Sequence, residues 1–514
     1  MSTSPETSHL CLLPTELVIQ IFSDLDIRSL LVCKQVCRLF KDIIVDAAAI
    51  QYKIELLVSG MDDGPPSGMS AAERLQMLKR HRNAWNNLRF SSEKTIPMLK
   101  GEVWELYGGV LSQARGPQSL AFKQLPSVIR GIEEKEWIVQ DLEFRIRDFG
   151  MDPSQDLLVV IESHSAHNQA FCIHLLNLYT GTPHTSAPHP AILEHIPSGD
   201  NYSYAIQISA QFLGVLFISG NDNDSELLVW NWRTGSRHLW LCGPDSASFT
   251  FLSDRHIIIG AIDRDDDELH ERQPEPELIV MDFLNTSGEK IITKSADFLC
   301  AFHFPLLSYW ATPLAMSIRS DPAPSWRPNP DLQVPFYAAK NDRLFVITFW
   351  MADALTVRTF LLFVPSSTIS SHLDSMTLGE TKHHVTWEEW GPKGTRMIPA
   401  SPGHSSVWVC YVFGMKFVSP TRKDGRKSID IYDFNPLALR RSEGGPTPMV
   451  NETAMQNGRI FQHEVTTSLP YRRWTLTPPA LEGERDFDAV MLSEDTLLTV
   501  SSESNVRWYR ILTL

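Results

Sequence analysis

The 514-residue sequence has few cysteines and no long apolar run. Its seven cysteines are an odd number and lie far apart, at positions 11, 33, 37, 172, 242, 300 and 410. This spacing excludes a disulfide framework and paired zinc knuckles. No continuous apolar stretch reaches the roughly 18 to 20 residues that cross a bilayer, and the opening "MSTSPETSH" lacks the basic and apolar regions of a signal peptide. We therefore expect a cytoplasmic or nuclear protein with no membrane partner.

Basic residues are also under-represented, since the formal net charge is −15. Residues 1–90 contain ten Lys plus Arg and ten Asp plus Glu, so the whole acidic excess lies beyond Phe90. An acidic domain of this size repels phosphate backbones, which argues against nucleic acid as a partner. One local basic cluster straddles Gly425, and we expect it to decorate a solvated hairpin: Arg422, Lys423, Arg426 and Lys427.

Catalytic and metal-binding patterns are missing as well. Cys33 and Cys37 are the closest cysteine pair and have no second pair with which to complete a tetrahedral site. The run "DRDDDE" from Asp263 imitates a calcium loop, but Glu268 stands where Gly is required and Pro274 where the bidentate Glu belongs, so we expect a solvated hairpin loop.

Four loop histidines have no carboxylate at a fixed spacing beside them, so a metal site is not expected: His164, His167, His184 and His189. There is no Gly-x-Ser-x-Gly elbow and no phosphate-binding glycine loop. We predict no cofactor, no metal and no catalytic residue. Carboxylate pairs for glycoside hydrolysis stay open, because spacing alone does not reveal them.

What the sequence does contain is a dense apolar region near its start, "LLPTELVIQIFSDLDIRSLLVCKQVCRLFKDII", residues 12–44. Pro14 can start a helix, and Asp26 can cap a second one. The apolar residues recur at spacings of three and four, which predicts three short helices. So small a unit buries little of its own surface, so part of its apolar set should face another chain.

This stretch resembles the F-box: a Leu-Pro start, an Ile-Phe in mid-helix, a Leu-Asp, a Leu-Leu pair, then Val-Cys-Arg and an aromatic, with Phe40 where the family often has Trp. The resemblance implies a three-helix module that docks on a Skp-type adaptor, which holds a cullin and a RING protein in an SCF ubiquitin ligase. It implies these adaptor-binding residues: Leu13, Pro14, Leu17, Ile21, Phe22, Leu25, Leu30, Leu31, Val36, Cys37 and Phe40. The alternative is that they form the core of a helical cap on the large domain.

Residues 1–58 are thus assigned to the F-box module. The Gly-, Pro- and Ser-rich segment 59–70 is expected to be a linker or extended loop. Ser70 and Glu73 fit a capping box at the start of a connecting helix, 71–88, with Trp85 as its packing anchor. The sequence "AWNNLRF" at the end of this helix, residues 84–90, resembles the junction of fungal F-box proteins.

Residues 89–514 are repetitive. Four strand-like endings align on one polar column flanked by apolar residues: Asn177, Asn231, Asp282 and Asp433. Further copies are expected at 120–122, 359–364 and 506–512. Upstream of these endings lie other apolar runs, several opened by an Asp: Asp156, Asp254, Asp342 and Asp495, with "LGVLFIS" from Leu213 and "VWVCYVF" from Val407 completing the set.

Period-two runs bounded by Gly, Pro and Asp turns predict strands, and long helical patterns are absent after Leu88. The repeat resembles degenerate WD-type blades, of which "VWNWRTG" is the nearest copy. We therefore predict a small all-α F-box module followed by an all-β propeller of about seven blades, six or eight being alternatives, in which the C-terminal strand completes the first blade. A pair of β-sandwiches is the structural alternative.

The predicted function is that of a non-catalytic, substrate-recognition subunit of an SCF-type ubiquitin ligase, which bridges the adaptor and a protein substrate of unknown identity. Two alternatives stay open. One is an F-box and propeller scaffold that acts outside any ligase, and the other is a propeller enzyme with a helical cap.

Overall fold

The structure is a computed structural model of the whole chain. It describes residues 12–101, 103–162, 170–199, 202–220, 225–244, 246–263, 274–340, 343–353, 355–377, 379, 381–401, 404, 410–441, 449–455, 458–478, 487–503 and 506–514. Within these ranges no helix is both long enough and apolar enough to span a bilayer.

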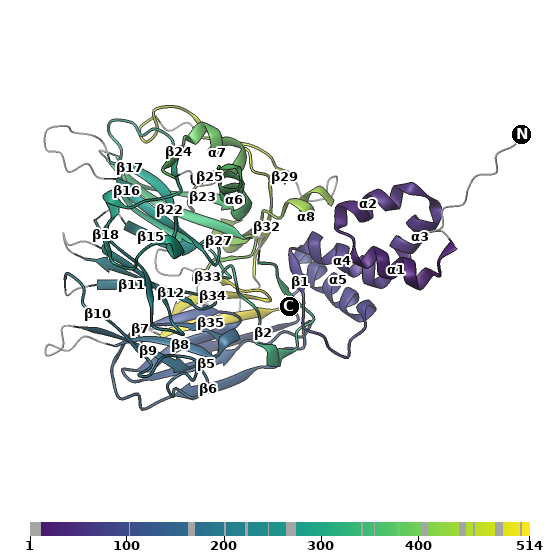
Figure 1. Cartoon of the computed structure of the whole chain (residues 1–514), viewed down its shortest axis with the longest axis horizontal. Coiled ribbons are helices and arrows are strands. Elements are labelled where there is room, and N and C mark those ends of the chain that lie inside the picture. The colour runs from purple at the N-terminus through teal and green to yellow at the C-terminus, as the bar shows by residue number, and fades with distance from the viewer. Residues whose placement is uncertain are drawn as a thin grey trace, which may run out of the picture.

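A group of helices projects from one side of a large β domain (Figure 1). Five helices form this group: α1 (Thr15–Asp24), α2 (Ile27–Val36), α3 (Arg38–Asp46), α4 (Ala48–Ser59) and α5 (Ala71–Asn87). The expected caps are present. The Asp26 side chain accepts a hydrogen bond from the backbone N–H of Ser29, and Ser70 with Glu73 forms the capping box of α5. We call α1–α5 the helical module.

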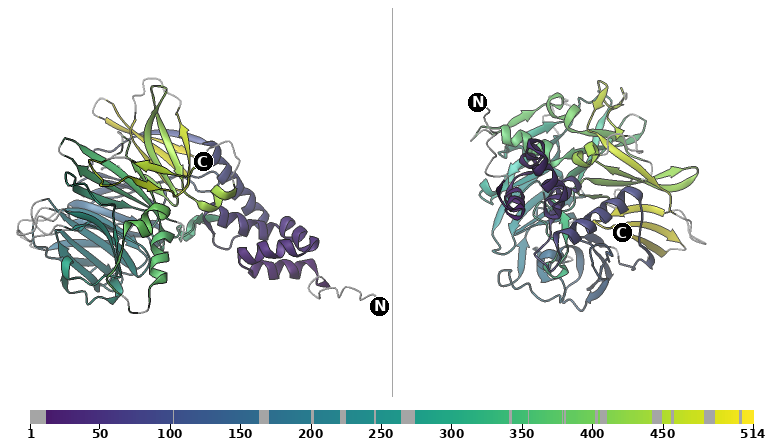
Figure 2. Two further views of the ribbon diagram at one scale, coloured as in Figure 1. Left: turned by 90° about the horizontal axis from the view of Figure 1, so that it is seen from above. Right: turned by 90° about the vertical axis from the view of Figure 1, so that its right-hand side faces the viewer.

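Seven of the nine sheets that the described β residues form radiate around a common axis as blades (Figure 2, right). In each sheet the strands are given from the axis outward. The first sheet contains β3 (Trp104–Tyr107), β4 (Val110–Gly116), β5 (Ser119–Gln124) and β6 (Lys135–Val139), and the second contains β7 (Ile146–Asp152), β8 (Leu157–Glu162), β9 (Phe171–Asn177) and β10 (Ile192–His195). The third contains β11 (Tyr202–Ser209), β12 (Phe212–Ser219), β13 (Ser225–Asn231) and β14 (Arg237–Gly243).

The next three sheets follow the same plan. They contain β15 (Ser246–Phe251), β16 (His256–Asp263), β17 (Glu275–Asp282) and β19 (Cys300–His303); β20 (Thr312–Arg319), β22 (Leu344–Ala352), β23 (Val357–Pro365) and β25 (Arg396–Pro399); and β26 (Val412–Phe413), β27 (Lys416–Lys423), β28 (Arg426–Asp433) and β32 (Tyr471–Leu476). Short outer strands extend three of the sheets: β18 (Lys290–Ile292) on β14, β24 (His383–Val385) on β19 and β29 (Met449–Val450) on β32. A separate pair is formed by β30 (Thr453–Met455) and β31 (Val465–Thr467).

The seventh sheet closes the ring with strands from both ends of the β domain. Its three inner strands are C-terminal, β33 (Phe487–Leu492), β34 (Thr496–Glu503) and β35 (Val506–Thr513), and its outermost strand is β2 (Ser92–Pro97). β2 and β35 pair antiparallel from Ser92 opposite Thr513 to Pro97 opposite Trp508. The chain is thus a helical F-box-like region followed by a seven-blade all-β propeller, and its C-terminal strand pairs with the first strand of the propeller.

The polar column of the repeat has a local structural cause. Asn177, Asn231, Asp282 and Asp433 each end the third strand of a blade. Each side chain accepts a hydrogen bond from a backbone N–H two or three residues ahead. These side chains cap the turns that leave the third strands, which is why Asn and Asp recur there. The other expected copies, 120–122, 359–364 and 506–512, also lie on third strands, β5, β23 and β35.

The column of second strands was predicted with one error. Asp156, Asp254 and Asp495 precede β8, β16 and β34 as expected, whereas Asp342 lies outside the described residues. "VWVCYVF" is not the second strand of the sixth blade: Val407–Val409 lie outside the described residues, and Val412–Phe413 form the first strand, β26. The second strand is β27, which a Pro at position 420 and four Lys, Ser and Arg residues make less apolar than its counterparts.

Long helical patterns are absent after Leu88, and the helices that the structure describes there are short. Helices α6 (Ser366–Ser375) and α7 (Trp387–Gly394) lie between the third and fourth strands of the fifth blade, and α8 (Pro436–Arg441) follows the third strand of the sixth. Each helix buries only a few apolar side chains. Ile369 of α6 and Trp387 and Trp390 of α7 pack on the propeller core. So short a pattern gives little periodic signal.

The basic hairpin is present as expected. β27 and β28 are joined by a turn in which Asp424 and Gly425 both have positive φ, with Lys423 opposite Arg426. The loop predicted from "DRDDDE" joins β16 to β17, but its residues 264–273 lie outside the described ranges.

Candidate interaction surface

The inner faces of α1–α4 form a small core of their own. The Phe22 ring meets the Phe40 ring edge to face, with 5.1 Å between their centroids, and both side chains are buried. Around this pair lie Val18, Leu30, Ile43, Ile44 and Ile50. These residues explain the helical spacing of the apolar pattern, and they are sealed within the module.

The eleven residues expected to bind an adaptor separate into two groups. Three are buried in the core, Phe22, Leu30 and Phe40, and two are half-buried, Leu25 and Cys37. The other six are exposed: Leu13 (39%), Pro14, Leu17 (47%), Ile21 (38%), Leu31 (47%) and Val36 (64%). The structure therefore divides the apolar pattern between the core of the module and its surface.

Sequence reasoning missed several exposed apolar residues of the same helices: Leu12 (68%), Val32 (60%), Leu39 (42%) and Val45 (45%). A signal for Val32 was present, because Val32 and Val36 are four residues apart and share one face of α2. That face is turned away from buried Leu30, two residues before Val32. We call the exposed apolar residues Leu12, Leu13, Leu17, Ile21, Leu31, Val32, Val36 and Leu39 the apolar outer face.

The helical module is joined to the propeller by strand pairing. The segment 59–70, expected to be a linker, contains β1 (Met61–Asp63), which pairs antiparallel with β21 (Phe336–Ala338). Gly64 continues this contact, since its N–H donates to the carbonyl of Pro335 at 3.0 Å. A Cβ at Gly64 would lie 1.9 Å from the Val334 carbonyl oxygen, so only glycine fits this approach. Arg74 of α5 is buried beside the pair and contacts the Asp63 carboxylate at 2.6 Å.

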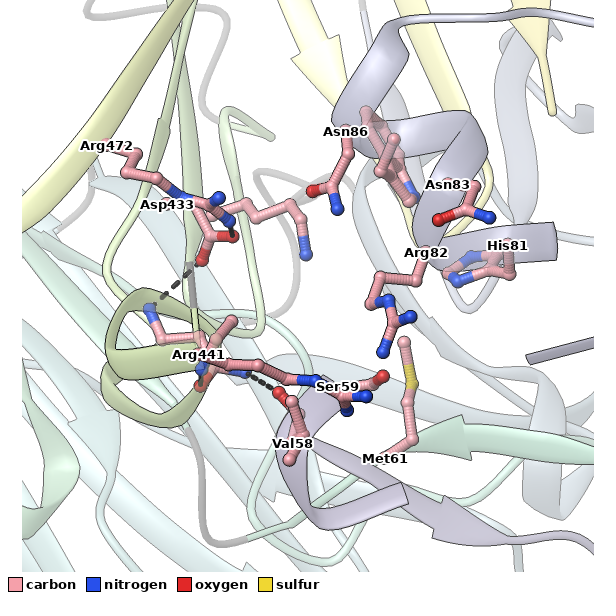
Figure 3. A pocket seen from close by; sticks show the side chains of 14 residues that line it. Val58, Ser59, Met61, His81, Arg82, Asn83, Asn86, Asp433, Arg441 and Arg472 are labelled. Atoms are coloured by element: carbon pink, nitrogen blue, oxygen red, sulfur yellow. Dashed lines mark hydrogen bonds and ion pairs between the residues drawn. The ribbon is translucent and has the colours of Figure 1, made fainter. Parts of the chain in front are cut away.

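A buried carboxylate binds three helices together at the same junction. Glu55 of α4 is 1% exposed and pairs with Arg82 of α5 and, at 2.7 Å, with Arg441 of α8. Arg82 and Arg441 both line a cavity of about 220 Å³ between the module and the propeller (Figure 3). On the same wall, Asn435 donates to the carbonyl of Val58 at 3.1 Å. Glu55 holds these helices in one arrangement because its buried carboxylate would be left without a compensating charge if both arginines moved away.

A second buried network lies beneath α5. Arg130 contacts Glu494 at 2.7 Å and Asp495 at 2.5 Å, and His81 of α5 contacts the other oxygen of Asp495 at 2.9 Å. Burial raises the pKa of Glu494 to about 7 despite the nearby Arg130. Burial alone would also raise the pKa of Asp495, but Arg130 and His81 together hold that pKa below its usual range. Asp495, which the sequence suggested as a turn residue, therefore accepts hydrogen bonds from both domains.

All these contacts lie at one end of the ring. Because neighbouring strands of each blade are antiparallel, the turn between the first and second strands and the connection between the third and fourth lie at the same end. β21, Glu494 and Asn435 lie in such connections. We call this end the proximal face and the opposite end the distal face. The helices stand in front of the blades when the molecule is seen from their side, as expected for a module on the proximal face (Figure 2, right).

Among the histidine and cysteine candidates that the structure describes, His184, Cys33 and Cys37 have partners within the fold. His184 is buried, with Nε2 at 3.0 Å from the Gln155 carbonyl and Nδ1 accepting from the Ser186 N–H. His189 is exposed, and His164 and His167 lie outside the described residues. Cys33 and Cys37 pack against the core of the helical module. In the described ranges no three His, Cys, Asp or Glu side chains are grouped to hold a metal ion.

Residues 10–51 match a family model described as F-box-like. Residues 10–51 are an F-box-like domain. The match covers α1, α2, α3 and the first residues of α4, and hence the whole apolar outer face. No curated protein matches the chain.

Several solved structures of low sequence identity match a large part of this chain. The WD40 domain of SCAP from fission yeast is 8% identical, with 82% of this chain and 98% of that chain covered and a TM-score of 0.38. Drosophila Semaphorin 2a is 8% identical, with 82% and 74% covered and a TM-score of 0.39. The β-propeller domain of the Trilobed protease from Pyrococcus furiosus is 10% identical, with 71% and 93% covered and a TM-score of 0.24. The count of seven blades rests on the strand pairing of this chain itself.

The F-box-like domain therefore presents apolar side chains to solvent while its base is fixed to the proximal face. Several exposed apolar side chains on one small domain are typical of protein interaction sites. An F-box-like domain joined to a propeller is the architecture typical of non-catalytic adaptors.

Proposed function

We propose that this chain is the substrate-recognition subunit of an SCF-type ubiquitin ligase, and that it has no catalytic role of its own. The observation that carries the proposal is the apolar outer face, which lies within an F-box-like domain and stays exposed although the domain is fixed to the propeller. In this proposal the face binds a Skp-type adaptor, and through it a cullin and a RING protein. The propeller holds a protein substrate, in the cytoplasm or the nucleus.

The proposed interface is built from two groups of residues with different tasks. Leu13, Pro14, Leu17, Ile21, Leu31, Val36 and the additional Val32 and Leu39 contact the adaptor, while Phe22, Leu25, Leu30, Cys37 and Phe40 keep the helices in the shape that presents them. Full burial of an aliphatic side chain contributes about 1.5–3 kcal/mol. Four or five such side chains are enough for a tight complex after the loss of rotational and translational freedom on association.

The proposed mechanism is proximity. The strand pair β1–β21 and the buried ions around Glu55 and Asp495 make the helical module and the propeller one unit. A substrate on the propeller is then held at a defined place relative to the ligase, which raises the local concentration of its lysines near the ubiquitin thioester. A rigid junction makes this effect larger than a flexible linker would.

The test is adaptor binding by the full chain. Leu31→Asp places a charge in the proposed interface and is expected to weaken adaptor binding by at least 100-fold, with an unchanged melting temperature because Leu31 is 47% exposed. Leu284→Asp is the matched control, since Leu284 is 42% exposed on the propeller. Full adaptor binding by both Leu31→Asp and Leu17→Asp would show that the proposal is wrong.

A second measurement separates the ligase from a scaffold that binds the adaptor but recruits no substrate. Proteins that bind the propeller are captured with the Leu31→Asp chain, which retains them but not the ligase. The proposal predicts that some of these proteins lose ubiquitin and accumulate when the wild-type chain is removed from cells. Unchanged ubiquitination of every captured protein would favour the scaffold.

A further inference from the structure

The axis of the propeller contains a cavity of about 280 Å³ whose wall is acidic and aromatic. Its lining comes from the innermost strands of several blades, including Glu105 of β3, Asp148 of β7, Tyr204 of β11 and Arg319 of β20. At about 30 Å³ of liquid volume for each water, the cavity has room for roughly nine water molecules. It can therefore hold a long side chain.

The cavity is closed at the proximal face by the long connection between β20 and β22. Asp321 and Ala323 belong to this connection. The Asp321 carbonyl accepts a hydrogen bond from the Gly414 N–H at 2.7 Å, and the Ala323 N–H donates to the Tyr107 hydroxyl at 3.3 Å. The hydroxyls of Ser325 and Ser209 are 2.9 Å apart. These contacts attach one segment to the sixth, first and third blades, so the segment crosses the axis and forms the floor of the cavity. A ligand must then approach from the distal face, away from the F-box-like domain.

Three carboxylates in the wall outnumber its cation. Glu105, Asp148 and Asp321 line the cavity with Arg319. Two other arginines act on the same carboxylates but are not part of the lining. Arg343 is buried and donates to the carbonyls of Phe251 and Leu252, and Arg147 is exposed and donates to the carbonyl of Tyr202. The side chains that line the cavity thus carry an excess of negative charge when all three carboxylates are ionised, which opposes a phosphorylated ligand.

Several polar atoms of the wall have no partner within the described structure. They are Oε2 of Glu105, the hydroxyl of Ser320, whose residue is 8% exposed, and Nε of Arg319. Buried polar atoms are normally hydrogen-bonded, so atoms left over at a cavity indicate a ligand. The Glu105 and Ser320 oxygens can accept hydrogen bonds from the N–H donors of such a ligand. Burial, followed by the charges of Asp321 and Asp148, raises the pKa of Glu105, and a bound cation would relieve this repulsion.

The ligand class follows from size and lining. No three metal-ligating side chains of the described residues are grouped closely enough to share an ion, so the carboxylates are too dispersed for a bare metal. Trp104, Tyr107 and Tyr204 add aromatic faces, which attract organic cations. We propose that the axial cavity binds the cationic side chain of an arginine or lysine in the protein substrate, inserted from the distal face. This inference rests on the proposed function, in which the propeller holds a protein substrate.

The test uses the full chain without adaptor and a fluorescent, capped nine-residue peptide of glycine, serine and alanine with one central arginine. Matched peptides carry lysine, citrulline or phosphoserine at the centre, and fluorescence anisotropy reports binding. The arginine or lysine peptide is expected to bind at least tenfold more tightly than the citrulline and phosphoserine peptides. Asp321→Asn and Glu105→Gln should each weaken that binding at least tenfold, and Asp148→Asn replaces either variant that does not fold.

Glu136→Gln is the control for loss of a negative charge, because Glu136 lies on the outer strand β6 with a side chain 66% exposed, and it should bind the peptides normally. Leu31→Asp should also bind them normally, so a defect in adaptor binding and a defect in this cavity are separable. Equal binding of arginine and citrulline, tighter binding of phosphoserine, competition by Ca²⁺, or no binding of any peptide at millimolar concentration would each overturn the inference.

Discussion

The indole N–H of Trp85 donates a hydrogen bond to the backbone carbonyl of Glu494 at 3.2 Å, between residues 409 positions apart. Trp85 lies in the last turn of α5, and Glu494 lies in the turn between β33 and β34 of the blade that closes the ring. The Trp85 side chain is 5% exposed and packs with the core of the sixth and seventh blades. The orientation of the F-box-like domain is therefore set by core packing at the proximal face.

Trp85→Ala is expected to loosen this junction. Truncation of a buried aromatic side chain costs about 3–5 kcal/mol, which is enough to open a local unit without unfolding the propeller. Hydrogen exchange should become faster in residues 59–90 and remain unchanged in β4, β8 and β12. Trp310→Ala is the matched control, since Trp310 is 67% exposed, and it should leave exchange in residues 59–90 as it is. Equal protection in both variants would mean that Trp85 does not hold the junction.

Phe22→Ala and Leu31→Asp should both lose adaptor binding, but for different reasons, although both residues belong to the predicted adaptor-binding set. Phe22→Ala removes a side chain that is 1% exposed and packs on Phe40, so it should destabilise the F-box-like domain by about 3–5 kcal/mol. Circular dichroism should then show lost helix together with lost adaptor binding. Leu31→Asp should lose adaptor binding with full helicity. Retained helicity in Phe22→Ala would contradict the core assignment.

Features that depend on neighbouring residues could be predicted from the sequence. The cap at Asp26, the capping box of Ser70 and Glu73 and the Asn and Asp column of the third strands all arise within four residues of chain. The repeat of apolar runs then predicted the blades, because the second and third strands of several blades are buried on both faces and form short continuous apolar runs. Within the interaction surface, the helical spacing identified apolar positions, but it did not separate exposed Leu31 from buried Leu30.

Contacts between distant parts of the chain could not be predicted. β1 was hidden in a Gly- and Pro-rich segment because its three residues pair with β21, more than 270 positions away. Glu105, Asp148 and Asp321 come together only because closure of the ring places the inner strands around one axis. In the sequence they are three of 61 acidic residues with no spacing in common.

Ring closure through β2 should contribute strongly to stability. Replacement of residues 92–97 by a glycine–serine sequence of the same length removes the outer strand and the packing of Ile96, and leaves β35 as an open edge. The expected result is a melting temperature lower by several degrees and a tendency to aggregate, seen by calorimetry and light scattering. Lys94→Thr, which removes only a surface ion pair with Glu134, should change neither. Wild-type melting of the replaced chain would contradict this role of β2.

Asp321→Asn should stabilise the protein at alkaline pH while it weakens peptide binding. Burial raises the pKa of Asp321 to about 6, from an ordinary 3.8, against the charges of Arg319 and Arg343, and Glu105, Tyr107 and Cys410 lie in the same electrostatic environment. The folded state therefore binds the proton more tightly than the unfolded state. The associated stabilisation is complete below about pH 4 and is lost as the pH rises to about 6.

Asparagine is neutral at every pH and should avoid this loss. Above pH 7 the free energy of unfolding of the variant should therefore exceed that of the wild type by at most about 2–3 kcal/mol. Urea unfolding at pH 8 should show the variant to be more stable than the wild type, with little difference at pH 4.5. Asp297→Asn, on a side chain that is 84% exposed, should show no such pH-dependent gain. A gain in stability combined with a loss of peptide binding would indicate that the buried carboxylate is retained for a ligand, because a residue kept only for the fold would not lower stability at neutral pH. Lower stability of Asp321→Asn at pH 8 would instead show that the carboxylate stabilises the floor of the cavity.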